Sequence, residues 1–366
     1  MVVVHHSASR VGPGRAAWLA TPAAVMDSGV AVFFVISGFL IYRPFVTAHI
    51  DRRPALRWRT FWWRRVLRIV PAYWLALSLL WAAGAFSLGR DWWRYYLFLQ
   101  IYDPFTSLGG IVPAWSLDTE MAFYLLVPFW ALLVRRVVAR GRHPVRFELA
   151  GTLALIVAGY TSRAVLSGVD RVWVDRPGQS PITLRAVSFT WLPNHLDLFG
   201  LGMTLAVLSA WSAANPRVLR SLHRWAARAE LWWGAAVLVF AWFAYRVGPP
   251  DFNAGYVGSY WQQRQAVVGL VSVCLLVPAV FGDQHRGWLR RLLRWPPVVW
   301  VGVVSYGLYL WHQDLLEQVP EWLDRPASGT PIVATLGAGF GLGLVAAALS
   351  WHLLEGPLQR RFKRLL

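Results

Sequence analysis

Two adjacent histidines stand near the start of the chain, in the run VVVHHS. An imidazole titrates close to neutral pH, so histidine is the side chain best suited to serve as a general base. On a helix, His5 and His6 would point about 100° apart, so only one of them can face the interior of a helix bundle. This pair is therefore a candidate for a single catalytic base, and a polar helix end is the structural alternative.

Two carboxylates, Asp118 and Glu120, interrupt the apolar run PAWSLDTEMAFYLLVP. Trp115, Glu120 and Tyr124 recur near i, i+4 spacing, so they could line one inward face of a helix. A carboxylate inside a membrane span costs about 2.5–3.5 kcal/mol on insertion scales, and it usually has a polar partner or a water-filled cavity. Glu120 is therefore a candidate functional residue. The alternative is a carboxylate near the outer membrane surface.

An arginine pair precedes another apolar run, in RTFWWRRVLRIVPAYW. Arg65 and Arg68 are three positions apart, so they share a face of a helix. Guanidinium groups bind phosphate through a planar fork of donors, so the pair suits a phosphorylated ligand. The alternative is a membrane anchor in which these arginines contact lipid headgroups.

A histidine also occurs late in the apolar run VGVVSYGLYLWHQDLL. There His312 lies close to Tyr309 and Asp314. These side chains could line a polar site. The alternative is a belt of aromatic and polar residues at the membrane interface.

Long apolar runs must position these residues. The 366 residues are 57% hydrophobic and only 15% charged, which excludes a disordered chain and argues against an ordinary soluble enzyme. The runs are continuous rather than alternating, which favours helices over a β-barrel. A membrane helix needs about 20 apolar residues. The predicted fold is an all-α, polytopic transmembrane helix bundle of about ten spans, with the first largely missing from this chain.

Nine full spans can be placed on the sequence, with Tyr95–Tyr102 too short to cross. They are Val25–Phe45, Ile69–Leu88, Val112–Val134, Leu149–Leu166, Asn194–Trp211, Leu231–Val247, Gln265–Phe281, Val298–Leu316 and Ile332–Leu353. The glycine pairs Gly337/Gly341 and Gly339/Gly343 within them predict close helix packing, and Gly38 indicates either close packing or a bend.

The first six residues look like the end of one further helix, because four apolar residues cannot cross about 30 Å of hydrocarbon. The run also lacks the basic start and apolar core of a signal peptide. We expect a start codon placed too far downstream, with a truncated protein as the alternative.

The charge distribution predicts an orientation. The net charge is +18, and every basic residue except Lys363 is arginine. Of the 36 basic residues, 25 lie in five segments, each separated from the next by two spans: Arg43–Arg68, Arg135–Arg146, Arg217–Arg228, Arg286–Arg294 and Arg360–Arg364. By the positive-inside rule this face is cytoplasmic, and the C-terminus is inside.

Other function classes are disfavoured by composition. A nucleic-acid-binding protein would need a soluble basic surface, whereas these arginines stand between apolar runs. Cys274 is the only cysteine and lies within a span, so disulfides and cysteine metal sites are excluded.

Taken together and in this order, the motifs resemble the acyltransferase-3 family, the membrane-bound O-acyltransferases of the O-antigen acetylase and macrolide acyltransferase type. The matching stretches are VVVHHS, GVAVFFVISGFLIYRPF, FWWRRVLRIVPAYW, PAWSLDTEMAFYLLVP, LDLFGLGM, VGVVSYGLYLWH and LEGP. They cover essentially the whole chain, although Val137–Pro193 matches only in hydropathy.

The resemblance implies roles for particular residues. The catalytic set is His6, Glu120 and Tyr124; the acyl-CoA-binding set is Arg64, Arg65 and Arg68; the substrate-binding set is Ser37, Trp115, Ser116 and His312; no metal is expected. His6 aligns with the histidine of the family's first helix, and His5 with a variable position. The family's arginine about ten residues earlier has no counterpart in this chain.

The resemblance also implies an activity. An acyl group, acetyl first among the candidates, would pass from acyl-CoA to a hydroxyl of a carbohydrate or a related cell-envelope or secondary-metabolite acceptor. The transfer would be direct or through a covalent relay. Acyl-CoA is a co-substrate, and no permanently bound cofactor is expected.

The expected location is the bacterial plasma membrane, with lipids and the acceptor as partners, no nucleic acid, and the oligomeric state open. The transferase domain would cover residues 1–357, followed by a basic cytoplasmic tail, 358–366, without a further soluble domain. Two alternatives remain. One is a transporter or flippase for a lipid-linked sugar, with Glu120, Asp197 and His312 on its path. The other is a truncated, inactive homologue.

Overall fold

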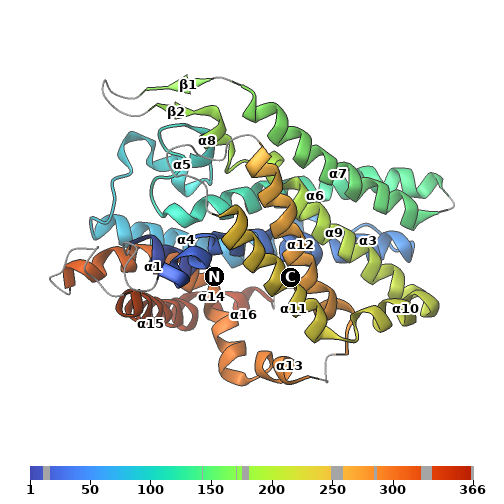
Figure 1. Ribbon diagram of the computed structural model, residues 1–366. Coiled ribbons are helices and arrows are strands. Elements are labelled where there is room, and N and C mark those ends of the chain that lie inside the picture. Colours follow the sequence, from blue (N-terminus) through green and yellow to red (C-terminus); the bar gives the residue numbers. More distant parts are fainter. Residues whose placement is uncertain are drawn as a thin grey trace. The chain divides into compact units, whose positions relative to one another are not determined.

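The computed structural model describes residues 1–10, 17–141, 143–169, 171–174, 181–248, 259–283, 287–322 and 332–363. These residues are almost entirely helical (Figure 1), which confirms the all-α prediction. Within these ranges the strands are β1 (Val172–Trp173) and β2 (Ile182–Thr183), an antiparallel pair in which Val172 lies opposite Thr183. Three arginines of the predicted basic segments, Arg142, Arg286 and Arg364, lie outside the described residues.

In the described part of the chain, seven helical segments are long and apolar enough to cross a membrane, and each overlaps a predicted span. They are Met26–Ile50, Trp58–Ala82, Val112–Ala139, Pro144–Ser167, Leu192–Ala214, Ser259–Phe281 and Val333–Phe362. The polytopic bundle is therefore supported by both length and composition.

The other two predicted spans are also helical but lie outside this set. Helix α11 (Ala229–Trp242) has 14 residues and continues as a π-helical turn, Phe243–Val247. Helix α14 (Pro296–Trp322) has 27 residues, but polar and aromatic side chains such as His312 dilute its apolar character.

The predicted span at Ile69–Leu88 is wrong at both ends. Helix α4 runs from Trp58 to Ala82, so it begins well before the predicted span, and Arg65 and Arg68 lie on a helix as predicted. The helix stops early because Gly84 adopts a positive φ of 78°, a conformation that glycine tolerates and that ends a helix.

The chain forms two compact units. The first contains Met1–Asp27, Arg59–Asp118 and Trp288–Leu366. Its α-helices are α1 (Val2–Arg10), α2 (Ala17–Ala24), α4, α5 (Trp92–Tyr96), α13 (Trp288–Leu293), α14, α15 (Ile332–Ser350) and α16 (Gly356–Lys363). Short 3-10 turns cover Met26–Ser28 (which ends in the second unit), Gly89–Asp91, Gln100–Tyr102 and Val112–Ala114, and a π-helical turn covers Trp351–Glu355.

The N-terminal helix of this unit is held by apolar packing. Val3 of α1 packs against a cluster formed by Val304 and Leu308 of α14 and Ala347 of α15. At the other end of the sequence, the predicted domain boundary after residue 357 falls inside α16, and residues 364–366 lie outside the described residues.

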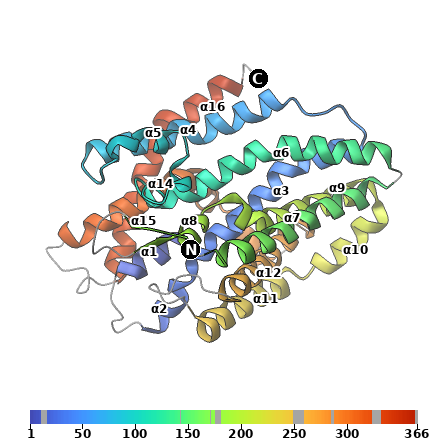
Figure 2. The same ribbon diagram turned by 90° about the horizontal axis from the view of Figure 1, so that it is seen from above.

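The second unit contains Ser28–Trp58 and Thr119–Gly287. Its α-helices are α3 (Gly29–Ile50), α6 (Trp115–Arg140, which begins in the first unit), α7 (Pro144–Ser167), α8 (Leu184–Ser188), α9 (Leu196–Ala214), α10 (Pro216–Ala226), α11 and α12 (Ser259–Phe281). A 3-10 turn, Leu192–His195, leads into α9. Figure 2 shows α3, α6, α7 and α9 running alongside one another.

Glycines allow α3 and α9 to approach closely. A Cβ on Gly38 would meet the backbone of Phe199, and a Cβ on Gly202 would meet the backbone of Val35. The two helices are therefore in backbone contact, which supports close packing as the role of Gly38.

Only one of the two predicted glycine pairs on α15 contacts another helix. Gly339 packs against Leu316, and Gly343 packs against Leu308. Within the described structure, Gly337 and Gly341 have no neighbour within 4 Å of an added Cβ, so this half of the prediction is wrong. The reason is geometric, because residues two apart point about 200° apart around a helix.

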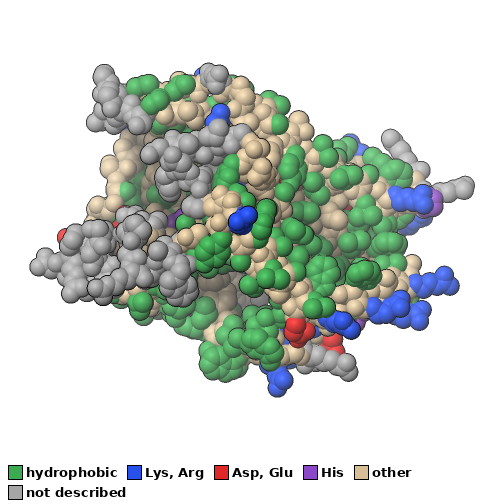
Figure 3. Space-filling view, in the orientation of Figure 1, with side chains coloured by type: hydrophobic (Ala, Val, Ile, Leu, Met, Phe, Trp, Pro, Cys, Tyr) green, Lys and Arg blue, Asp and Glu red, His purple; other side chains and the backbone are tan. Residues whose placement is uncertain are grey.

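Three of the predicted basic segments meet at one end of the second unit. Arg52 and Arg53 at the end of α3 line the same cavity as Arg135 near the end of α6. Figure 3 shows Lys and Arg side chains gathered at the turn between α6 and α7 and along α10, where Arg217 and Arg220 are exposed. This clustering agrees with the positive-inside pattern in this unit.

Candidate functional site

Helix α1 places His6 against a histidine of α14 in the first unit. Nδ1 of His6 lies 2.7 Å from Nε2 of His312, and the two rings are nearly parallel, with centroids 5.0 Å apart. His312 is completely buried, which argues against the alternative of an interfacial belt residue. The neighbouring His5 instead places its Nδ1 3.2 Å from the carbonyl oxygen of Ala23. His5 and His6 thus make different contacts, as the helix geometry predicts.

The hydrogen bonds of His312 determine which nitrogen of His6 can act as a base. Nδ1 of His312 lies 2.8 Å from the carbonyl oxygen of Tyr309 and 3.2 Å from that of Leu308. Carbonyl oxygens only accept, so Nδ1 must carry the proton, and Nε2 of the neutral ring is an acceptor. His6 then donates through Nδ1, which leaves the lone pair of its own imidazole on Nε2.

Ser116 lies in the same unit and contacts the same helix. Its hydroxyl oxygen is 2.7 Å from the hydroxyl of Tyr309, which also donates to the carbonyl oxygen of Pro113 at 2.7 Å. Ser116 is buried, whereas Trp115 beside it is half-buried. Tyr309 and His312 are three residues apart on α14, so this helix contacts both His6 and Ser116.

A second polar cluster, in the second unit, surrounds Glu120 of α6. Ser37 of α3 donates its hydroxyl to Oε1 of Glu120 at 2.5 Å, and Tyr124 donates to the same oxygen at 2.6 Å. All three side chains are buried. A buried carboxylate needs such partners, because an unsatisfied one carries a large desolvation penalty. The structure thus brings together three of the predicted site residues.

The predicted donor arginines all lie on α4. Arg64 and Arg68 are exposed, and Arg65 is half-buried with its guanidinium carbon 5.6 Å from the centroid of the Phe61 ring. Arg68 also lies close enough to Glu355 for an electrostatic interaction, and Glu355 accepts a hydrogen bond from Ser350 at 2.9 Å. The arginines are therefore positioned on one helix, with a carboxylate near Arg68.

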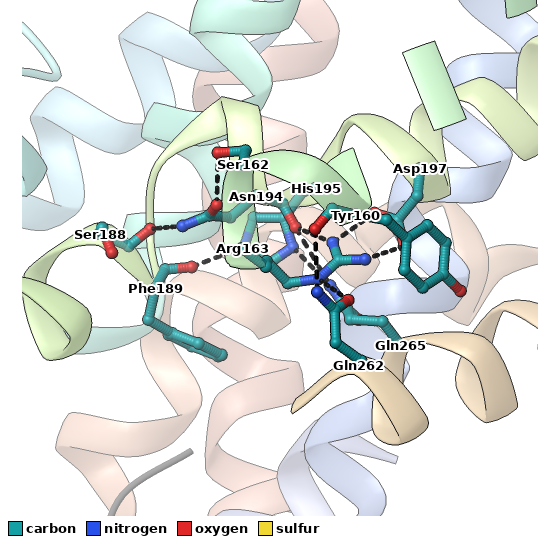
Figure 4. Close-up of polar contacts among 10 residues, drawn as sticks. All are labelled: Tyr160, Ser162, Arg163, Ser188, Phe189, Asn194, His195, Asp197, Gln262 and Gln265. Carbon is teal, nitrogen blue, oxygen red and sulfur yellow. Dashed lines mark hydrogen bonds and ion pairs between the residues drawn. The ribbon is translucent and has the colours of Figure 1, made fainter. Parts of the chain in front are cut away.

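A buried ion pair in the second unit has no counterpart in the sequence predictions. Arg163 of α7 forms two hydrogen bonds with the carboxylate of Asp197 on α9, at 2.9 and 3.0 Å (Figure 4). Its guanidinium also donates to the backbone oxygen of Asn194 at 2.5 Å and to Oε1 of Gln262 at 3.0 Å. Arg163 and Asp197 are each about 1% exposed.

The signal for this pair was present, because Arg163 is a lone arginine within the predicted span Leu149–Leu166. Such a residue normally faces the bundle interior and pairs with an acid. The structure also shows that Asp197, named for the transporter alternative, is fully engaged with Arg163. As for metals, the described residues contain no group of three or more His, Cys, Asp or Glu side chains able to hold an ion.

Comparison with known proteins identifies relatives over nearly the whole chain. YrhL of Bacillus subtilis, provisionally named a peptidoglycan O-acetyltransferase, is 25% identical over 351 residues, which cover 90% of this chain and 50% of YrhL. The peptidoglycan O-acetyltransferase OatA of Listeria monocytogenes is 21% identical over 355 residues, 91% of this chain and 51% of OatA. The acyltransferase MdmB of Streptomyces mycarofaciens is 26% identical over 358 residues, 92% of this chain and 81% of MdmB.

The chain thus spans about half the length of the first two relatives. No solved structure matches it significantly. The sequence profile described as "Acyltransferase domain" matches residues 1–354, almost the full length and including both polar clusters. The chain therefore belongs to the acyltransferase-3 family.

Proposed function

We propose that this protein is a membrane-bound O-acyltransferase that moves an acyl group from acyl-CoA to a hydroxyl of a carbohydrate. Membership of the family supports the reaction class, and the names of two relatives, peptidoglycan O-acetyltransferases, support a sugar acceptor and an acetyl group. The helices that can cross a membrane support a multi-pass protein of the bacterial plasma membrane. The arginine-rich face and the C-terminus are assigned to the cytoplasm, where acyl-CoA is found.

The contact between His6 and His312 is the observation that carries this proposal. It leaves the lone pair of His6 on Nε2, which would accept the proton of the acceptor hydroxyl as its oxygen attacks the thioester carbonyl. In a direct transfer a C–O ester bond forms, the C–S bond breaks, and the departing CoA thiolate takes up the proton. General-base assistance of this kind contributes about 10²–10⁴-fold to the rate.

The other predicted residues receive supporting roles in the same proposal. In the second unit, Glu120 holds the hydroxyls of Ser37 and Tyr124, and an acceptor hydroxyl could replace either donor at its carboxylate. Trp115 and Ser116 are assigned to acceptor binding. His312, which the sequence assigned to substrate binding, is here given the role of positioning His6.

The phosphates of CoA are assigned to the arginines of α4, Arg64, Arg65 and Arg68. Their guanidinium groups match the planar geometry of phosphate recognition. The transporter alternative is less favoured, because Asp197, one of the three residues on its path, is neutralised by Arg163.

The test compares two adjacent histidines. Membranes containing the wild type, His6→Ala or His5→Ala are incubated with radiolabelled acetyl-CoA and a peptidoglycan fragment, and both CoA release and labelled acceptor are measured. The proposal expects a loss of about 10²-fold or more for His6→Ala and near wild-type rates for His5→Ala. Full activity of the His6 variant would show that another group is the base.

A further inference from the structure

We propose that a second phosphate-binding site, formed by other arginines than those of α4, lies at the basic end of the second unit. A cavity of about 270 Å³ opens there between the end of α3, the end of α6 and the start of α7. Three arginines line it, Arg52, Arg53 and Arg135, together with His49, and the described lining residues include no carboxylate. A cavity lined by three arginines, one of which (Arg53) is paired with Asp51, is suited to an anion.

Arg135 provides the first specific argument. Its Nη1 is buried and has no hydrogen-bond partner among the described residues. Buried guanidinium donors are normally satisfied, so a donor without a partner at a cavity wall calls for an acceptor from outside the chain. A phosphate oxygen would supply that acceptor, with a charge of the right sign.

The backbone at Arg52 provides the second argument. Arg52 closes α3 with a φ of +53°, while the N–H of Arg53 bonds the carbonyl of Ala48 at 2.8 Å. This is the helix-ending turn that normally carries glycine or asparagine at the left-handed position. An arginine pays backbone strain at such a position, and strain of this kind is concentrated at functional sites. The positive charge of Arg52 at the cavity would explain why an arginine stands at this strained position.

The acidic groups nearby are already neutralised. Asp51 pairs with Arg53 at 2.9 Å on the surface. The buried carboxylate of Glu148 accepts a hydrogen bond from Tyr42 at 2.6 Å and shares a second hydrogen bond with Nδ1 of His49. The start of α7 at Pro144 also lines the cavity, and the positive end of a 24-residue helix favours an anion there.

An apolar groove beside the cavity indicates what carries the phosphate. Its lining shares Ala48, His49 and Arg135 with the cavity, and the rest of it is apolar, including Phe45, Leu56, Trp58 and Leu132. A ligand occupying both would have a phosphate and an apolar chain. Two sources have this chemistry, an anionic membrane phospholipid and the acyl-CoA donor. A lipid would act independently of the proposed activity, whereas acyl-CoA would depend on it.

The test uses the purified full chain in detergent and measures binding of dihexanoyl-phosphatidic acid and, separately, of CoA. Neutral dihexanoyl-phosphatidylcholine is the control for the apolar chain. Arg135→Gln removes the buried donor's charge, and Arg136→Gln is its matched control, because Arg136 is the next residue of α6, is exposed and does not line the cavity. We expect Arg135→Gln to weaken phosphate binding about tenfold, as for the loss of one charge-assisted contact, and Arg136→Gln to leave it unchanged.

The variant Arg52→Gly distinguishes an effect on phosphate binding from an effect on the stability of the fold. Glycine suits the positive φ, so this variant should unfold at a higher temperature than the wild type and yet bind the phosphate probe more weakly. An effect on phosphatidic acid alone identifies a lipid site, and an effect on CoA alone identifies a donor site. Equal binding of both probes by the wild type and Arg135→Gln, or equal weakening by Arg136→Gln, would overturn the proposal.

Discussion

At the scale of single residues, His312 matters because it gives His6 an orientation and a tautomer. An imidazole that exchanges its proton between two nitrogens presents the wrong one to a substrate part of the time. The two backbone carbonyls keep the proton of His312 on Nδ1, so its Nε2 is an acceptor. Nδ1 of His6 then carries the proton of the 2.7 Å hydrogen bond, which fixes the tautomer of His6. In the proposed mechanism His312 is therefore a positioning residue rather than a catalytic one.

This role predicts different outcomes for two substitutions of His312. His312→Gln retains an oxygen that can accept from Nδ1 of His6, whereas His312→Leu has no acceptor. We expect kcat for acetyl transfer to fall about 10²-fold in the leucine variant, within the range of general-base catalysis, and much less in the glutamine variant. The KM for acetyl-CoA should stay unchanged in both. Equal losses in the two variants would indicate a packing role instead.

The residues of the candidate site were predictable to different degrees. Glu120 and Tyr124 are four apart on one helix, so their contact follows from local geometry. Ser37 joins them from α3, 83 positions away, and His312 meets His6 across 306 positions. Such contacts depend on which helices pack against each other, and the residue pattern within one helix does not determine that. Arg163 was missed although its place within an apolar run was a usable signal.

At the scale of helices, the backbone contact between α3 and α9 depends on Gly38 and Gly202, because a larger residue at either position would overlap the other helix. We expect Gly202→Ala to destabilise the protein by about 1–3 kcal/mol, because the added methyl group overlaps the backbone of Val35 and forces the helices apart. Gly234→Ala on α11 is the matched control. It has no neighbour within 4 Å in the described structure, and it should be neutral or stabilising by up to about 1 kcal/mol.

The midpoint of thermal unfolding in detergent checks this pair. A lowered midpoint for Gly202→Ala with an unchanged or raised one for Gly234→Ala is the expected result. Similar midpoints for both variants would mean that α3 and α9 are not in backbone contact.

The ion pair between α7 and α9 predicts strong coupling. Removing one partner leaves a buried charge unpaired, so Arg163→Met and Asp197→Leu should each cost about 3–5 kcal/mol. The double variant should be more stable than either single variant, because it leaves neither charge behind. Unfolding of the four proteins measures the coupling, and simple additivity of the two effects would contradict the geometry shown in Figure 4.

The helices themselves were largely predictable, and their ends were not. Continuous apolar runs in the sequence predicted all seven segments that can cross a membrane, because a membrane span must be a long, continuous helix. The start of α4 was missed because Trp58 to Arg68 is too polar to resemble a span, although it forms one helix with the apolar part. The face of α15 that packs against another helix could not be predicted either, because its four glycines form two pairs with the same spacing, and the sequence does not distinguish one pair from the other.

At the scale of the whole molecule, the arginine distribution predicts which end of the second unit faces the cytoplasm. In the second unit, basic side chains gather at the end where α3 and α6 stop and α7 begins. Helix α7 has 24 residues and is about 36 Å long, enough to cross the hydrocarbon layer. Its two ends should therefore lie on opposite faces of the membrane.

The chain is well suited to a direct test of this arrangement, because Cys274 is its only cysteine and lies buried between α11 and α12. In a Cys274→Ala background, His143→Cys places a thiol just before α7, and Val172→Cys places one in β1, beyond its other end; both positions are exposed. A membrane-impermeant maleimide should label Val172→Cys in intact cells, and His143→Cys only after permeabilisation, because the arginine-rich end is retained inside. The opposite pattern would place the arginines away from the cytosol, where they could not meet acyl-CoA, and the proposed direction of acyl transfer would fail with it.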